Sequence, residues 1–256
     1  DPTSVKHPLR SPVPAELSPG ELALCAGFLL TAYVIRGIVG FGSGLIAIPL
    51  LALILPLPLV VPAVALTDYL ASASQGIGNR RDILWRALVP LVPFVLAGVA
   101  VALYLFRQVD PGLLTRALGV FVICYAGYTL LGLHPGRVAR PHWAAPLGGL
   151  GAMVGTLFGT GGPFYVAYLQ LWGPSKGQFR ATAATAFLIE GSTRMSGYLV
   201  AGFFTRDALL LFVLALPLAA LGLYAGHHVH TSIGEAAFRR LIGVLLAGSG
   251  LALLLR

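Results

Sequence analysis

Gly37-Ile-Val-Gly-Phe-Gly-Ser-Gly44 and Gly155-Thr-Leu-Phe-Gly-Thr-Gly-Gly-Pro163 are two glycine clusters that each interrupt a long apolar stretch. The apolar runs on either side of the clusters are 21–36, 44–57, 143–158 and 163–173. A helix needs about 20 apolar residues to cross a bilayer, and each of these runs is shorter than that. The clusters therefore predict two pairs of short helices whose breaks lie inside the membrane.

The composition of the chain agrees with a membrane protein. Hydrophobic residues make up 57% of the 256 residues and charged residues only 10%, whereas soluble domains carry about 25% charged residues. Soluble enzymes and disordered chains are excluded by these figures. Six further apolar runs are long enough to span a bilayer: 59–78, 83–106, 111–133, 178–202, 208–228 and 235–255. The fold class predicted is an all-α polytopic membrane protein.

The net charge of +8 does not indicate nucleic acid as a partner. Most basic residues stand singly or in pairs between the apolar runs, which is the placement that sets the orientation of a membrane protein. No stripe of basic and aromatic residues is present. The partner expected from this placement is the lipid bilayer, and a homo-oligomer is left open.

The chain divides into a Pro-rich flexible arm at 1–19 and two internal repeats, at 20–134 and 143–256, which together form one integral membrane domain. Gly40-Phe-Gly-Ser-Gly44 aligns with Gly159-Thr-Gly-Gly-Pro163. Further along, Ala63-x-Ala-x-Thr67 aligns with Ala181-x-Ala-x-Thr185. Each half is thus a broken pair followed by three full helices. Broken helices at corresponding positions of two halves indicate the binding site of a transporter.

The two halves can run parallel or inverted. Both arrangements give the same division of Lys and Arg between the two sides, so the positive-inside rule does not choose between them. A continuous helix over 21–56 would be about 54 Å long, against a hydrocarbon core of about 30 Å. We therefore favour a re-entrant pair in each half and inverted repeats, with both termini facing outward.

The glycine clusters are candidates for an anion site. Exposed backbone at membrane depth persists only where protein or a cavity satisfies its polar groups, and a helix that begins at such a break presents unpaired N–H groups. The alternative is close helix packing through small residues. The candidate donors are Gly40, Gly42, Ser43, Gly44, Thr160, Gly161 and Gly162.

Arg36, Asp68, Glu190 and Arg194 are ionisable residues inside apolar runs, where a charge costs about 2.5–3.5 kcal/mol. Arg36 and Arg194 are predicted to hold an anion. Asp68 and Glu190 are candidates to carry a coupling proton. Supporting polar residues surround Asp68 on its helix: Thr67, Tyr69, Ser72 and Gln75.

Each of these charges also has a purely structural explanation. Arg36 lies near a helix end and can snorkel to the interface. Glu190 and Arg194 are spaced i,i+4 and can pair with each other without touching a ligand. Asp68 can pair with Arg36 or be protonated.

No cofactor, metal or catalytic activity is expected. The sequence contains none of the motifs HExxH, GxSxG or the P-loop. His227, His228 and His230 form a cluster with only Glu235 as an additional ligand, so we interpret them as part of a solvated loop rather than a zinc site.

The chain resembles the sulfite exporter TauE/SafE family of bacterial membrane proteins. The resemblance rests on Gly40-Phe-Gly-Ser-Gly-Leu-Ile-Ala-Ile-Pro-Leu-Leu51, Phe158-Gly-Thr-Gly-Gly-Pro-Phe164 and Asn79-Arg-Arg-Asp-Ile-Leu-Trp-Arg86. It implies a permease of the bacterial inner membrane for small sulfur-containing anions such as sulfite, thiosulfate or organosulfonates, commonly an exporter. Many members are Asn-Lys-like where this chain has Asp68-Tyr69, so Arg36 and Arg194 would supply the positive charge.

The function predicted is therefore secondary transport of a small sulfur-containing anion by alternating access, with proton coupling as an option. Two alternatives remain open at this point. One is an anion channel of the same fold. The other is a transporter of a cationic or neutral solute that uses Asp68 and Glu190 as ligands.

Overall fold

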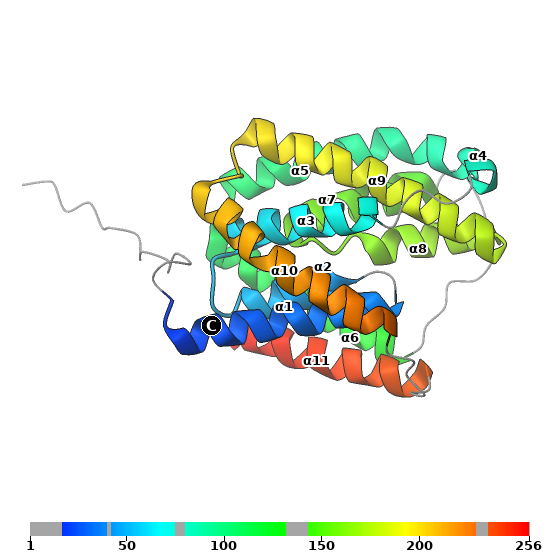
Figure 1. Ribbon diagram of the computed structural model, residues 1–256. Helices are drawn as coiled ribbons and strands as arrows, with labels where there is room; N and C mark the ends of the chain where they lie inside the picture. Colours follow the sequence, from blue (N-terminus) through cyan, green and yellow to red (C-terminus); the bar gives the residue numbers. More distant parts are fainter. Residues whose placement is uncertain (1–16, 40–41, 75–79, 132–142, 229–234, 256) are drawn as a thin grey trace, which may run out of the picture.

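The computed structural model describes residues 17–39, 42–74, 80–131, 143–228 and 235–255, and every regular element within these ranges is a helix (Figure 1). This confirms the all-α fold class. Gly40 and Gln75 lie outside the described residues, as does the 1–16 portion of the predicted arm.

The helices follow the predicted apolar runs closely. The first half contains α1 (Pro19–Val39), α2 (Ser43–Leu51), α3 (Leu57–Ser74), η2 (Arg80–Asp82), α4 (Trp85–Leu88), η3 (Val89–Leu91), α5 (Val92–Gln108) and α6 (Pro111–Leu131). The second half contains α7 (Ala144–Phe158), α8 (Gly162–Leu171), α9 (Lys176–Ala201), α10 (Arg206–His228) and α11 (Glu235–Leu255).

The first helix is longer than predicted. It was expected to end at residue 36, but α1 continues through Gly37 and Ile38 to Val39. The reason is packing against α10: a Cβ on Gly37 would meet the Cα of Gly226 at 2.9 Å. Gly37 therefore serves as a close-packing residue inside the helix and is not part of the break.

Four helical stretches within the described residues are long and apolar enough to cross a membrane. They are Pro19–Ile38, Trp85–Gln108, Pro111–Leu131 and Arg206–His228. Their outer faces expose large apolar side chains such as Val101, Leu113 and Leu221. Exposed apolar surface of this extent fits a lipid surround, and it explains the low share of charged residues.

The helices pack in pairs that join the two halves of the chain. The most extensive contacts are between α1 and α10, between α6 and α11, and between α5 and α7. The α6–α11 pair is antiparallel, because Gly119 meets Gly250 while Leu130 meets Gly243. In Figure 1 the end of α11 lies at the same end of the bundle as the start of α1.

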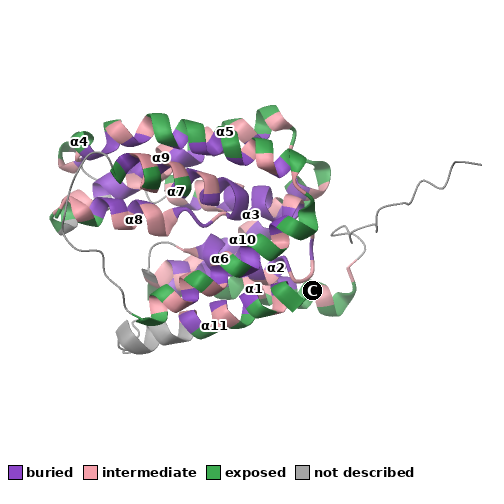
Figure 2. Ribbon diagram, turned by 180° about the vertical axis from the view of Figure 1, so that it is seen from behind, coloured by how far each residue is buried: buried purple, intermediate pink, exposed green. Residues whose placement is uncertain are grey.

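The short helix α2 and helix α3 lie in the interior of the bundle. All residues of α2 except Leu50 are buried, and Figure 2 shows the buried class concentrated on α2, α3 and α7 while α5 turns an exposed face outward. Helices α3 and α9 also contact each other. Of the helices beside the two chain breaks, α2 is thus the most shielded from the surroundings.

The contact between α1 and α10 gives a stability prediction. A methyl group at Gly226 would press on the Cα of Gly37 at 2.9 Å, and overpacking of this kind costs roughly 1–3 kcal/mol. We expect Gly226→Ala to lower the melting temperature of the detergent-purified protein. Gly27→Ala on α1 is the matched control, because a Cβ there has nothing within 4 Å; equal melting of the two variants would contradict the packing assigned here.

Candidate functional site

A cavity of about 110 Å³ lies where the two chain breaks meet. Its volume is enough for several water molecules, or for an anion of a few heavy atoms. It is lined by residues from α1, α2, α3, the α7–α8 break and α9: Arg36, Gly42, Gly44, Leu45, Asp68, Tyr69, Ser72, Gly159, Thr160, Gly161, Gly162, Pro163, Phe187, Glu190, Gly191 and Arg194. Both halves of the chain therefore contribute to one site.

The backbone at the two breaks requires glycine. Gly42 precedes α2 with φ 94° and Gly159 ends α7 with φ 65°, which is the left-handed region that side chains disfavour. A Cβ on Gly44 would collide with the Gly159 carbonyl oxygen. The first break therefore packs directly on the second, and the cavity occupies the space beside this contact.

Two helix N-termini border the cavity. Gly42 and Gly44 belong to the start of α2, and Gly161 and Gly162 belong to the start of α8. At both helices the part of the chain described here provides no side-chain cap for the first amides. Uncapped N–H groups and the positive end of the helix dipole favour a negative charge at this place.

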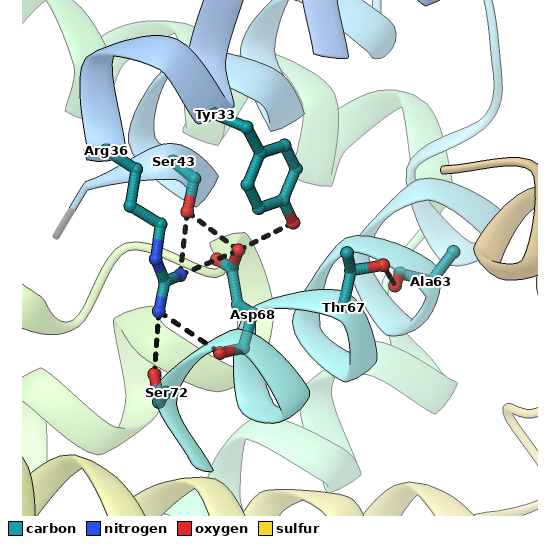
Figure 3. A network of polar contacts seen from close by, with 7 residues as sticks. All are labelled: Tyr33, Arg36, Ser43, Ala63, Thr67, Asp68 and Ser72. Atoms are coloured by element: carbon teal, nitrogen blue, oxygen red, sulfur yellow. Dashed lines mark hydrogen bonds and ion pairs between the residues drawn. The ribbon is translucent and has the colours of Figure 1, made fainter. Parts of the chain in front are cut away.

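On one side of the cavity, Arg36 and Asp68 form an ion pair with 2.9 Å between Nη1 and Oδ1 (Figure 3). The Arg36 guanidinium also donates to the Ser43 hydroxyl at 2.9 Å and to the Ser72 hydroxyl at 2.7 Å. Asp68 accepts from the Ser43 hydroxyl and from the Tyr33 hydroxyl, both at 2.7 Å. The network links α1, α2 and α3, and it surrounds both charges with partners.

On the other side, Glu190 and Arg194 lie one turn apart on α9, with 3.5 Å between Oε1 and Nε. Arg194 donates from Nη1 to the Gly155 carbonyl oxygen at 2.6 Å, which ties α9 to α7. The Tyr198 hydroxyl makes a second tie, to the Thr156 carbonyl oxygen. The i,i+4 pair predicted from sequence is confirmed.

The sequence model of the sulfite exporter TauE/SafE family matches residues 23–253. The chain belongs to this family. It is also 30% identical over 192 residues to the probable inner membrane transporter protein TsaS of Comamonas testosteroni, over 74% of this chain and 80% of that relative. No solved structure matches the chain.

Membership of the TauE/SafE family confirms the resemblance carried by the glycine motifs. Together with the long apolar helices, it makes the chain a multi-pass membrane transporter.

Most of the residues singled out from sequence meet at the cavity of this TauE/SafE protein. Those that line it are Arg36, Gly42, Gly44, Asp68, Tyr69, Ser72, Thr160, Gly161, Gly162, Glu190 and Arg194. Ser43 lies beside the cavity and bridges Arg36 and Asp68. Thr67 does not line the cavity; its hydroxyl donates to the Ala63 carbonyl oxygen at 2.9 Å within α3. Gly40 and Gln75 fall outside the described residues.

The sequence analysis missed Tyr33, which is fully buried and holds Asp68. Its position three residues before Arg36 on α1 was the available signal, since residues spaced i,i+3 share a helix face. The prediction of a solvated loop at the histidine cluster is wrong in part. His227 and His228 are exposed, but they are the last residues of helix α10. His230 is not among the described residues.

The Arg36–Asp68 network gives a second stability prediction. Asp68→Leu leaves the buried Arg36 without a counter-charge, and breaking a buried pair in this way costs about 3–5 kcal/mol. The double variant Arg36→Met/Asp68→Leu removes both charges and should recover much of that loss. Unfolding of the single and double variants in mixed detergent micelles measures the difference. The pairing would be contradicted if the loss of unfolding free energy in the double variant equalled the sum of the losses in Arg36→Met and in Asp68→Leu.

Proposed function

We propose that this protein is a secondary transporter of the bacterial inner membrane that exports a small sulfur-containing anion. Sulfite, thiosulfate and small organosulfonates are the candidate substrates. The observation that carries the proposal is the cavity at the two breaks, which two arginines and the N-termini of α2 and α8 all border. The membrane assigned follows the relative, which is named as an inner membrane transporter.

The chemistry of the cavity suits an oxyanion. A guanidinium group is a planar fork of donors that matches two oxygens of one anion, and it keeps its charge at any working pH. Helix N-terminal amides add donors that need no side chain. The volume of about 110 Å³ leaves room for an anion with three oxygens on one sulfur.

The charges of the cavity bear on coupling. The positive charges of Arg36 and Arg194 are formally cancelled by the negative charges of Asp68 and Glu190. A bound monoanion therefore gives the site one excess negative charge. Helix dipoles can offset part of that charge, and a proton on one carboxylate can offset the rest. Proton coupling is therefore part of the proposal.

The helix pairing supports alternating access between inverted repeats. α1 packs on α10 and α7 packs on α5. If α4, η3 and α5 are counted as the single stretch Trp85–Gln108, the first helix of each half contacts the fourth of the other. The last helices of the halves, α6 and α11, are antiparallel. We infer that the halves have opposite orientations in the membrane and rock around the shared cavity.

The solute alternatives are less well supported. Asp68 is bound by Arg36, Ser43 and Tyr33, so it has little capacity left to bind a cationic substrate. An anion channel of the same fold differs in kinetics, because its flux does not saturate with substrate concentration.

Transport by purified protein in liposomes tests the proposal. We expect saturable flux of sulfite or thiosulfate, and we expect Arg194→Ala to abolish it because a buried counter-charge in the cavity is lost. Arg116→Ala is the matched control: Arg116 is exposed on α6 and is not among the lining residues of the cavity. Flux that never saturates would favour a channel, and unchanged flux in Arg194→Ala would remove that residue from the site.

A further inference from the structure

The two arginines at the cavity differ in how completely they are bound by the protein. Arg36 makes hydrogen bonds to Ser43, Ser72 and the Asp68 carbonyl oxygen, besides its ion pair with the Asp68 carboxylate. Of its nitrogens only Nε has no partner within the described residues. Arg36 and Asp68 therefore satisfy each other, and they hold α1, α2 and α3 together.

The opposite side of the cavity is incomplete. Among the residues the structure describes, the Thr160 hydroxyl has no hydrogen-bond partner, while Glu190 Oε1 and Arg194 Nε have only each other, as an ion pair at 3.5 Å. The three residues are almost fully buried, with 2%, 4% and 8% of their surface exposed. All three line the cavity. Buried polar groups that lack partners are costly and rare, so the free Thr160 hydroxyl beside this long ion pair indicates a missing ligand.

We propose that the anion binds on the α8–α9 side of the cavity, held by the Arg194 guanidinium, the Thr160 hydroxyl and the first amides of α8, and that Glu190 takes up a proton when it binds. This assignment rests on the proposed function and adds different roles for the two ion pairs of the cavity. Arg36 and Asp68 are positioning residues that shape the cavity and do not exchange partners during transport.

The link between anion and proton follows from the sharing of Arg194. Glu190 and the anion are both negative and both depend on this one guanidinium. A proton on Glu190 removes the repulsion and converts its carboxylate into a hydroxyl donor that can face an anion oxygen. Asp68 cannot serve in the same way, because Arg36, Ser43 and Tyr33 already compensate its charge.

Among the described residues, the groups that can supply or receive charge near Glu190 lie on a few elements. Arg194 and Tyr198 share its helix, and Tyr165 faces it from α8. Arg36 from α1 and Asp68 and Tyr69 from α3 line the same cavity. Helix α7 presents the Gly155 backbone. Helix α5 presents the apolar Val99 and Leu103 near Gly197, while the η2–α4 connection meets α9 at Thr182, two turns earlier.

Calorimetric titration of the purified full chain with sodium methanesulfonate tests the assignment. This probe stays ionised over the working pH range, so any proton taken up belongs to the protein. Where Glu190 is ionised in the empty protein, we expect uptake of about one proton per anion and an affinity that falls about tenfold per unit rise in pH. Glu190→Gln should bind without proton uptake and with affinity independent of pH, whereas Asp68→Asn should keep the wild-type pH dependence.

A threonine pair tests the position of the anion without touching a charge. Thr160→Val removes the free hydroxyl, and we expect methanesulfonate to bind roughly tenfold to a hundredfold more weakly. Thr185→Val on α9 is the matched control, because its hydroxyl is already bonded to the Ala181 carbonyl oxygen.

The outcomes separate this inference from the proposed function. If wild-type protein binds neither methanesulfonate nor sulfite at any pH, the proposed function itself is wrong. If it binds them, the inference is overturned by pH dependence that survives Glu190→Gln, or by equal affinities of Thr160→Val and Thr185→Val. The wild-type pH dependence and the threonine pair keep the test valid even if Asp68→Asn fails to fold.

Discussion

The structure depends on backbone that is left without helical partners in the middle of an apolar bundle. Water is scarce there, so each unpaired N–H or C=O group must be satisfied by protein or by a ligand. The chain meets this constraint by packing its two breaks together, with Gly44 against the carbonyl oxygen of Gly159. The cavity is the space beside this contact that remains unfilled. Its lining is polar because the unpaired groups of both breaks border it.

Burial also explains why the charges of the cavity come in pairs. A lone charge inside the bundle would be costly, and each arginine is accompanied by a carboxylate. The pairs nevertheless differ in geometry. Arg36 and Asp68 come from separate helices and are fixed by Ser43, Ser72 and Tyr33. Glu190 and Arg194 come from one helix, at i,i+4 spacing, and their charged atoms are 3.5 Å apart. Both side chains face the cavity, as does the N-terminus of α8.

Much of this arrangement could be predicted from the sequence, because apolar run length and glycine clustering are local signals. They located the helices and both breaks, and the cost of intramembrane charge singled out all four ionisable residues. The partner of Arg36 stayed open, since Asp68 is 32 residues away and their pairing depends on how α2 places α1 and α3 around the first break. The length of α1 was underestimated because Gly37 packs on Gly226, far along the chain. The incomplete hydrogen bonding of Thr160 has no sequence signature, because it is the outcome of packing around the second break.

The claim at the centre of this account is that a small oxyanion occupies the hollow between the two breaks. Selenite has the shape and charge of sulfite, and its selenium atom can be located by anomalous diffraction. Crystals of the protein grown with selenite should show one selenium peak in the cavity, beside the Arg194 guanidinium and the start of α8. A cavity that holds only water while selenite binds elsewhere, or not at all, would contradict the account.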